Sequence, residues 1–200
     1  MSLRNSLLKQ FGRPVGTLGL IAGWLMEKSN KERNKWMMDK VQFSESDRVL
    51  EIGFGTGDTC KEVASILTRG FIAGVDHSKL MYQQSMKRMK EFIDEKRAAL
   101  HWGTVWELKY PSNYFDVVYA SNVHFFWPDP SLEFVQLRQF LKPKGKIVMV
   151  FQPRWIRSEE DILRIAESTR LNLMEAGFRN VQVELKQMKP VTGVLVSAEK

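Results

Sequence analysis

The chain has 200 residues, 44% of them apolar and 26% charged, which is typical of an ordinary globular protein with one domain. Cys60 is the single cysteine, which excludes an intrachain disulfide framework. The formal net charge of +7 would suit an anionic partner, but basic and acidic residues are interleaved along the sequence. A solvated basic surface therefore explains the charge more simply than a nucleic-acid interface does.

No segment has the features of a secretory signal or of a membrane span. Residues 3–10 mix charged with apolar side chains, and no cleavage site of small residues follows them. The longest apolar stretch, residues 15–26, is shorter than the roughly 20 residues that cross a bilayer. We therefore expect a cytoplasmic protein.

From residue 47 onward, short β-branched runs alternate with helical patterns, which predicts a parallel sheet with crossover helices. Five parallel strands and a final hairpin-like pair are expected, at residues 48–52, 71–75, 100–105, 115–120, 146–151, 181–185 and 191–198. Helices are expected at residues 58–67, 78–93, 134–141 and 158–176, with a turn at 143–145. The helix that begins at Ser78 is expected to bury Tyr82, Met86, Met89 and Ile93, which recur at helical spacing.

The segment before the sheet has a different character. Residues 7–26 are apolar and interrupted by four glycines, and a polar run at 29–35 follows. We interpret residues 1–45 as an N-terminal helical extension packed on a domain formed by residues 46–200. Such an apolar segment should be buried, so we expect it to cover the pocket as a lid built from about residues 7–36. A peripheral membrane contact and a purely structural helix are the alternatives.

A glycine-rich turn, Gly53-x-Gly55-x-Gly57, joins the first expected strand to the first expected helix. Glycines allow the chain to turn tightly and a ligand to approach the bare backbone. In open α/β sheets, this switch point binds nucleotide-like ligands. Residues 49–60 contain Glu51 and Asp58 but no Lys or Arg. That charge favours the ammonium and sulfonium of S-adenosylmethionine over the pyrophosphate of a dinucleotide.

Asp76 ends the second expected strand, about 20 residues after the glycines. A carboxylate at this position can accept hydrogen bonds from both hydroxyls of a ribose. Alternatively, Asp76 caps the helix that begins at Ser78, and the two roles are compatible.

Together these segments resemble the class I S-adenosylmethionine-dependent methyltransferases of the small-molecule type. Residues 49–57 and 74–78 look like their motifs I and II, and residues 115–122 resemble their fourth strand. Residues 141–147 and 175–178 are similar to the lead into their fifth strand and the end of their last helix, and residues 11–14 and 34–36 to one branch of small-molecule members. The similarity runs from residue 46 to the C-terminus. It implies a doubly wound, Rossmann-like α/β fold, with a seven-stranded, mostly parallel sheet whose last strand is reversed.

The resemblance also implies a set of contacts with S-adenosylmethionine along the carboxyl ends of the strands: Glu51, Gly53, Gly55, Gly57, Asp76, His77 and Met81. The first four would serve the methionine end, Asp76 the ribose, and the last two the adenine. Thr104 stands where many members have an acidic residue for the adenine amino group. Its hydroxyl is a weaker acceptor, and the neighbouring backbone is an alternative.

The loop after the fourth expected strand should face the transferred methyl group, which places Asn122 beside the cofactor. His124 is a candidate general base, or it simply fills a position in the loop. Phe125, Phe126 and Trp127 either wall a substrate pocket or pack the loop on the sheet. We assign no catalytic residue, because methyl transfer is an in-line displacement that positioning and exclusion of water can accelerate.

The sequence thus predicts a methyltransferase that uses S-adenosylmethionine and acts on a small-molecule acceptor, whose identity it does not define. No metal is expected, because His101 and Cys60 lack partners at metal-ligand spacing. Two alternatives stay open. A nucleic-acid-directed member would need basic residues beside residues 122–127, and a non-catalytic member would bind the cofactor without turnover.

Overall fold

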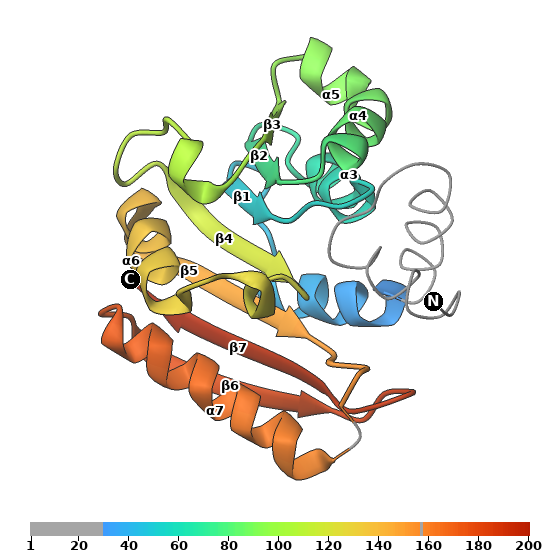
Figure 1. The fold of residues 1–200 in the computed structure, drawn as a ribbon. Helices are drawn as coiled ribbons and strands as arrows, with labels where there is room; N and C mark the ends of the chain where they lie inside the picture. The colour runs from blue at the N-terminus through green and yellow to red at the C-terminus, as the bar shows by residue number, and fades with distance from the viewer. Residues whose placement is uncertain (1–29, 157) are drawn as a thin grey trace.

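The computed structural model describes residues 30–156 and 158–200. In it, seven strands form one sheet in the order β3-β2-β1-β4-β5-β7-β6 (Figure 1). The strands are β1 (Arg48–Ile52), β2 (Phe71–Asp76), β3 (Ala98–Trp102), β4 (Phe115–Ser121), β5 (Leu141–Phe151), β6 (Arg179–Lys186) and β7 (Gly193–Glu199). The pairs from β3 to β5 are parallel, and β7 is antiparallel to both β5 and β6. The predicted sheet with a reversed last strand is therefore confirmed.

Helices connect the strands: α3 (Asp58–Ile66), α4 (Lys79–Arg88), α5 (Lys90–Asp94), α6 (Pro130–Phe140) and α7 (Glu159–Glu175). Two short 3-10 turns, η1 (Val105–Glu107) and η2 (His124–Phe126), follow β3 and β4. Residues 30–41 form a further helix ahead of β1. Within the described chain, no helix is long and apolar enough to cross a membrane.

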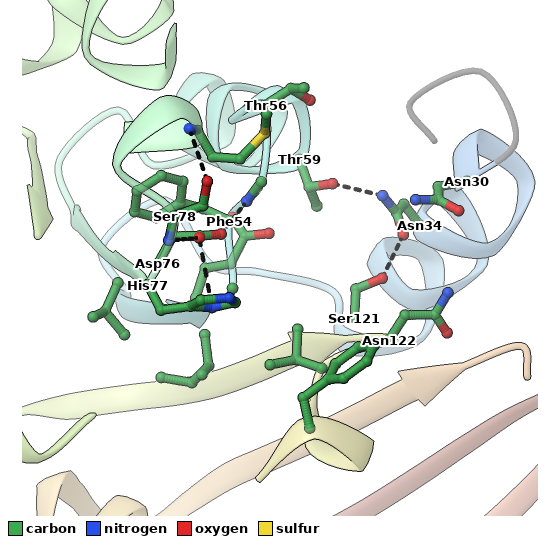
Figure 2. A pocket seen from close by; sticks show the side chains of 18 of the residues that line it. Asn30, Asn34, Phe54, Thr56, Thr59, Asp76, His77, Ser78, Ser121 and Asn122 are labelled. Carbon is green, nitrogen blue, oxygen red and sulfur yellow. Dashed lines mark hydrogen bonds and ion pairs between the residues drawn. The ribbon is translucent and has the colours of Figure 1, made fainter. Parts of the chain in front are cut away.

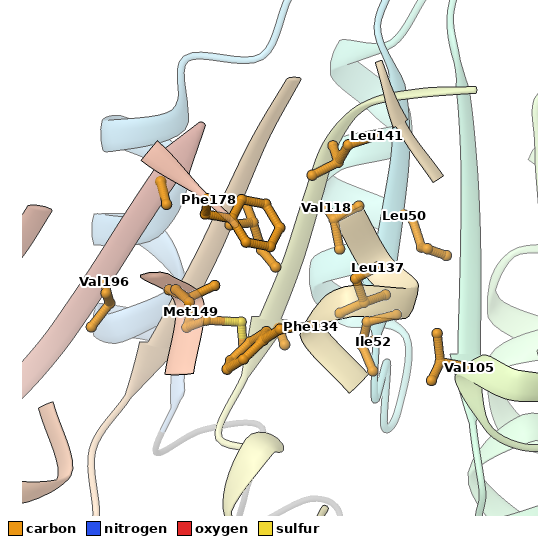
Figure 3. Packing of buried hydrophobic residues seen from close by; sticks show 14 of the residues in the cluster. Leu50, Ile52, Val105, Val118, Phe134, Leu137, Leu141, Met149, Phe178 and Val196 are labelled. Atoms are coloured by element: carbon orange, nitrogen blue, oxygen red, sulfur yellow. The ribbon is translucent and has the colours of Figure 1, made fainter. Parts of the chain in front are cut away.

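The core has two layers, one on each face of the sheet, because successive side chains of a strand point to opposite faces. Leu50 and Ile52 of β1 join a cluster with α6 and α7 (Figure 3), whereas Val49 joins a cluster with α3, α4 and the helix at 30–41. Trp36 and Met37 bring that last helix into the second layer, where both are buried. Residues 30–41 are therefore tied to the sheet through apolar packing.

The helix predicted at 78–93 is divided in two. Met89 ends α4 and begins α5, and the fully buried positions are Met81, Ser85, Met89 and Phe92. Of the predicted stripe only Met89 is fully buried, while the other members are partly buried. The buried face is rotated because Ser85 occupies its centre, where its hydroxyl donates a hydrogen bond to Gly55 O at 2.8 Å. A pattern of apolar residues alone misses this polar position.

Three other predicted boundaries were wrong. The third strand ends at Trp102 instead of residue 105, because Gly103 turns the chain and Glu107 accepts hydrogen bonds from Thr104. Helix α6 begins at Pro130 instead of residue 134, since the Asp129 side chain caps it. The turn expected at 143–145 lies inside β5, as an irregularity in its pairing with β4.

Candidate functional site

A cavity of about 730 Å³ opens at the carboxyl ends of β1, β2 and β4 (Figure 2). Its walls come from the loops after β1, β2, β3 and β4 and from the helix at 30–41. Eleven of the predicted site residues line it: Glu51, Gly53, Gly55, Asp58, Asp76, His77, Met81, Thr104, Asn122, Phe126 and Trp127. The fold thus gathers side chains that are up to 76 positions apart in the sequence (residues 51 to 127) into one space.

The glycine turn forms the floor of the cavity. Gly53, Gly55 and Gly57 all have positive φ angles, of 73°, 54° and 80°, which glycine adopts at no steric cost. Gly53 N donates a hydrogen bond to Val75 O at 2.7 Å, which fixes the turn to β2. Gly57 does not line the cavity; it packs against Ser85 of α4. Its role is to let α3 and α4 approach each other.

Glu51 is a buried acid at the inner end of the cavity. Tyr119 of β4 donates a hydrogen bond to Glu51 Oε2 at 2.8 Å. Burial raises the pKa of the Glu51 carboxyl to about 8, although hydrogen bonds from Tyr119 and Cys60 oppose the shift. A buried acid with a raised pKa gains most from a cationic ligand, because the ligand stabilises the charge that burial penalises. Asp58 is less available, since it forms an ion pair with Arg88.

Asp76 ties the end of β2 to the glycine turn. One carboxylate oxygen accepts a hydrogen bond from Gly55 N and the other from Ser78 N, each at 2.8 Å. Burial raises the pKa of Asp76, and these two backbone donors partly offset the shift. Ser78, and not Asp76, is the N-cap residue of α4. Each Asp76 oxygen retains a lone pair, so the carboxylate can still accept hydrogen bonds from a ligand.

The far end of the cavity lies beyond Asp76, at the loops after β2 and β3. His77 and Met81 line this end, and the indole of Trp102 donates a hydrogen bond to His77 O at 3.1 Å. Thr104 also lines it, but the Thr104 hydroxyl and backbone N–H both donate to Glu107 Oε2, at 3.1 and 2.6 Å. The polar hydrogens of Thr104 are therefore used within η1.

The loop after β4 closes the cavity beside the glycine turn. Asn122 has a φ of 57°, and its side-chain oxygen accepts a hydrogen bond from Gln152 N at 2.7 Å. This bond holds the left-handed turn in place and leaves the Asn122 residue on the cavity wall.

Comparison with known proteins finds similarity to methyltransferases. A family model described as a methyltransferase domain matches residues 49–145. The uncharacterized methyltransferase YdaC of Bacillus subtilis (strain 168) is 27% identical over 182 residues, which cover 90% of this chain and 98% of the relative. Residues 49–145 thus form a methyltransferase domain, and the fold of the described chain is that of the class I methyltransferases.

Solved structures share the fold of this methyltransferase. One is described as a SAM-dependent methyltransferase from Aquifex aeolicus, with a TM-score of 0.69 at 16% identity, over 88% of this chain and 97% of that one. Another is the phosphoethanolamine N-methyltransferase 2 of Haemonchus contortus in complex with phosphomonomethylethanolamine and S-adenosylhomocysteine. Its TM-score is 0.67 at 17% identity, over 84% of this chain and 53% of that one.

His124 of the methyltransferase does not line the cavity, which favours the second of its two expected roles, that of filling a position in the loop. It is buried below the loop, where its Nε2 lies 3.1 Å from the Thr169 hydroxyl of α7. Burial lowers the pKa of His124 to about 3. Because the Thr169 hydroxyl donates to Ile165 O, it must accept from His124 Nε2–H. The ring is neutral and serves the core, so we do not assign it as a general base.

The three aromatic residues of this loop divide between the two predicted roles. Phe125 packs edge-on against Phe151, at 5.3 Å between ring centroids, and against Trp155, at 5.0 Å. Phe126 and Trp127 line the cavity, and Trp127 also packs on Phe134 of α6. The loop therefore packs on the core through Phe125 and presents the other two rings to the cavity.

A polar network that was not predicted lies at the end of the cavity next to the helix at 30–41. Arg33 is 1% exposed, and its guanidinium donates hydrogen bonds to Ser121 Oγ at 2.9 and 3.2 Å. The Ser121 hydroxyl donates to Asn34 Oδ1 at 2.8 Å, and Asn34 Nδ2 donates to Thr59 Oγ1 at 2.7 Å (Figure 2). Burial and the nearby Arg154 lower the pKa of Arg33 to about 9. This network fixes the helix at 30–41 to β4 and α3.

The structure describes only part of the expected N-terminal lid. Residues 7–29 of the expected lid, and its glycines, lie outside the described residues. Residues 30–36 are described, and Asn30, Lys31, Asn34 and Lys35 line the cavity.

Among the described residues, no group of three or more His, Cys, Asp or Glu side chains is placed to hold a metal ion.

Proposed function

We propose that this methyltransferase binds S-adenosylmethionine in the 730 Å³ cavity and transfers its methyl group to a small-molecule acceptor. The observation that carries the proposal is the pair of buried carboxyls, Glu51 and Asp76, at either side of an open glycine turn. They fit the cationic methionine end and the ribose of that cofactor. The same acids would oppose a pyrophosphate.

In this proposal Glu51 accepts a hydrogen bond from the α-ammonium group, and the bare backbone at Gly53 and Gly55 allows close approach. Asp76 accepts from the ribose hydroxyls. His77, Met81 and Thr104 border the adenine, and Asn122 borders the sulfonium. An added Cβ at Gly55 would meet nothing within 4 Å, which leaves space above the turn for a ligand.

Bound S-adenosylmethionine would supply a methyl group on a positively charged sulfur. A nucleophile would take this methyl group, and the sulfur would leave as the neutral thioether of S-adenosylhomocysteine. The residues of the chain would orient the acceptor and exclude water. Phe126, Trp127 and the helix at 30–41 border the cavity and suit that role. No side chain is assigned to remove a proton, because His124 is neutral and buried away from the cavity.

The small-molecule acceptor is supported by two observations. The cavity is bordered by aromatic side chains and by the helix at 30–41, which leaves a compact space beside the glycine turn. The Haemonchus contortus structure of the same fold is described in complex with phosphomonomethylethanolamine, which is a small molecule.

Isothermal titration calorimetry tests the cofactor. We expect S-adenosylmethionine and S-adenosylhomocysteine to bind with micromolar dissociation constants, and NAD to give no heat. A methyl-labelled donor incubated with protein and metabolite pools should then yield one labelled product. Binding of NAD without binding of S-adenosylmethionine would refute the proposal. Binding without any labelled product, from metabolites or from added RNA, would favour a non-catalytic member.

We also propose that residues 1–45 are an N-terminal extension that covers the cavity, with residues 46–200 as the cofactor-binding domain. The described part of this extension lines the cavity through Asn30, Asn34 and Met38. Hydrogen exchange of the amides at residues 30–41 should slow when S-adenosylhomocysteine binds, because the ligand stabilises the closed form. Equal exchange rates with and without ligand would make this helix a structural element only.

A further inference from the structure

Phe126 places a largely exposed aromatic ring in the wall of the cavity. Its side chain lines the cavity and is 54% exposed. Its neighbour Phe125 instead packs on Phe151 and Trp155. An exposed ring keeps a large apolar area in contact with water, and a ligand that covers this area binds favourably. The cavity wall therefore offers an apolar contact that the fold of the described chain leaves unused.

This ring belongs to an apolar surface that begins at the glycine turn. The Val123 side chain packs directly over Gly53, and Val123, Phe126, Trp127 and Pro128 all line the cavity. These four residues, which we call the aromatic strip, lie in one loop and reach solvent at Phe126 and Pro128. A molecule that binds beside the methionine end of the proposed cofactor therefore meets the aromatic strip.

The aromatic strip is held in a fixed shape. Phe126 N donates a hydrogen bond to Val123 O at 2.9 Å and Trp127 N to His124 O at 3.2 Å, within and just after η2. The Trp127 ring packs edge-on against Phe134 of α6, at 5.3 Å between ring centroids. Rings that are positioned before a ligand arrives lose little conformational freedom on binding. Fixed rings favour a planar aromatic ligand, since aromatic pairs gain from stacked or edge-on geometry beyond the area that they bury.

Polar side chains at this end of the cavity are bonded to one another. The Ser121 hydroxyl accepts hydrogen bonds from Arg33 and donates one to Asn34, whose amide in turn donates to Thr59 (Figure 2). The charged side chains that line this end are all exposed to solvent, where they keep their hydration: Lys31, Lys35 and Glu62. The surface offered to an acceptor beside the glycine turn is therefore mainly apolar.

We propose that the methyl acceptor is an aryl compound, a planar aromatic molecule with a hydroxyl or thiol group, whose ring stacks on Phe126 and Trp127. This inference rests on the proposed function, whose acceptor class it specifies. Aryl hydroxyls and thiols lose their proton to water more readily than their saturated counterparts, so no side chain is needed to remove it. The resulting anion is attracted to the sulfonium.

The transfer balances without a further reactant. A lone pair of the ionised oxygen or sulfur forms the bond to the methyl carbon while the bond from that carbon to the sulfonium sulfur breaks. The electron pair of the broken bond stays on that sulfur, which gives S-adenosylhomocysteine. The products are this thioether and an aryl methyl ether or thioether, and the proton of the acceptor has passed to water.

The test separates recognition of the ring from the chemistry. Calorimetry titrates the protein, saturated with S-adenosylhomocysteine, with 2-naphthol and with its saturated counterpart decahydro-2-naphthol. The wild-type protein should bind 2-naphthol about tenfold more tightly, because only the planar rings stack on Phe126 and Trp127. With a methyl-labelled donor, 2-naphthol and 2-naphthalenethiol should yield a labelled ether and a labelled thioether.

Phe126→Leu and Leu132→Ala form a matched pair of variants. Phe126→Leu keeps an apolar side chain but removes the ring, so the preference for 2-naphthol should fall by about threefold to tenfold. Leu132 of α6 is 55% exposed, like Phe126, but does not line the cavity, so Leu132→Ala should leave the preference as in the wild type. Phe126→Tyr keeps a ring and should retain the preference. Thermal melting of each variant confirms that the fold is retained.

The outcomes separate this inference from the proposed function. A preference that falls in Phe126→Leu and persists in Phe126→Tyr supports the inference. If the wild-type protein binds S-adenosylhomocysteine but binds the two alcohols equally, or if Phe126→Leu keeps the full preference, the inference is wrong while the proposed function stands. The same holds if the labelled donor modifies a metabolite without an aromatic ring and neither aryl compound. If the wild-type protein does not bind S-adenosylhomocysteine, the proposed function itself fails.

Discussion

Glu51→Gln is expected to raise the temperature of unfolding above pH 7 and, in the same protein, to weaken binding of S-adenosylmethionine. Burial raises the pKa of the Glu51 carboxyl from 4.5 to about 8. The folded protein therefore keeps a proton there that the unfolded chain releases between these pH values. Because the folded state binds more protons in this window, the free energy of unfolding falls as the pH rises through it. Glutamine does not ionise and avoids this loss, which we take as about 2–4 kcal/mol at pH 8.

Glu51→Gln is expected to stabilise the fold above pH 7 but to weaken the binding of S-adenosylmethionine. A ligand ammonium stabilises the ionised form of Glu51, so binding should release a proton near pH 7, and the affinity of the wild-type protein should rise up to about pH 8. Glutamine loses this charged contact, at a cost of about 1.5–3 kcal/mol in binding free energy. Calorimetry in buffers of different ionisation enthalpy measures the proton release directly. It should be present in the wild type and absent in Glu51→Gln.

Tyr119→Phe is the matched control, since it removes the hydrogen bond to Glu51 but keeps the acid. That bond lowers the Glu51 pKa, so its loss should move the pH dependence of binding to higher pH and leave the affinity at high pH nearly intact. If Glu51→Gln binds S-adenosylmethionine as tightly as the wild type at pH 8, Glu51 does not contact the ammonium group.

The parts of the molecule that follow from local sequence were predictable. The strands alternate with helices and carry continuous β-branched runs, so a mostly parallel sheet was predictable from the pattern, and the reversed last strand followed from the family resemblance. Gly53, Gly55 and Asp76 stand directly at strand ends, where position along the chain alone places them at the edge of the sheet. These residues line the cavity as the sequence predicts.

Residues whose environment depends on distant segments were not predictable. Arg33 stands in the polar run at 29–35, where no role was predicted for it, yet it is buried and donates hydrogen bonds to Ser121 of β4. Glu133 precedes the helix expected at 134–141, yet it lies in the first turn of α6, where the Trp106 side chain of η1 makes a hydrogen bond with it. His124 shows the reverse: its loop reaches the cavity, but α7 supplies Thr169 and draws the ring into the core. In each case the deciding partner is about 30 or more positions away along the chain.

Gly55→Ala is expected to weaken cofactor binding strongly and to cost the fold less than Gly57→Ala does. Gly55 lines the cavity, and an added Cβ would meet no protein atom within 4 Å, so the methyl group would occupy the space proposed for the ligand. An alanine at a φ of 54° costs about 1–2 kcal/mol. The binding of S-adenosylhomocysteine should fall by about 1–3 kcal/mol or more, because the turn and the ligand cannot both keep their places.

Gly57→Ala provides the contrast, because its φ is also positive but its surroundings are protein. A Cβ there would lie 2.7 Å from the Ser85 Oγ atom and 2.9 Å from Ser85 Cβ, so α3 and α4 would have to separate. We expect a loss of about 2–4 kcal/mol in unfolding free energy, measured by urea denaturation. Adding Ser85→Gly should recover part of that stability, since it removes both clashing atoms. Full cofactor binding by Gly55→Ala would mean that the space above Gly55 is not where the ligand lies. Equal stability losses in the two variants would mean that an added Cβ at Gly55 meets protein atoms as well.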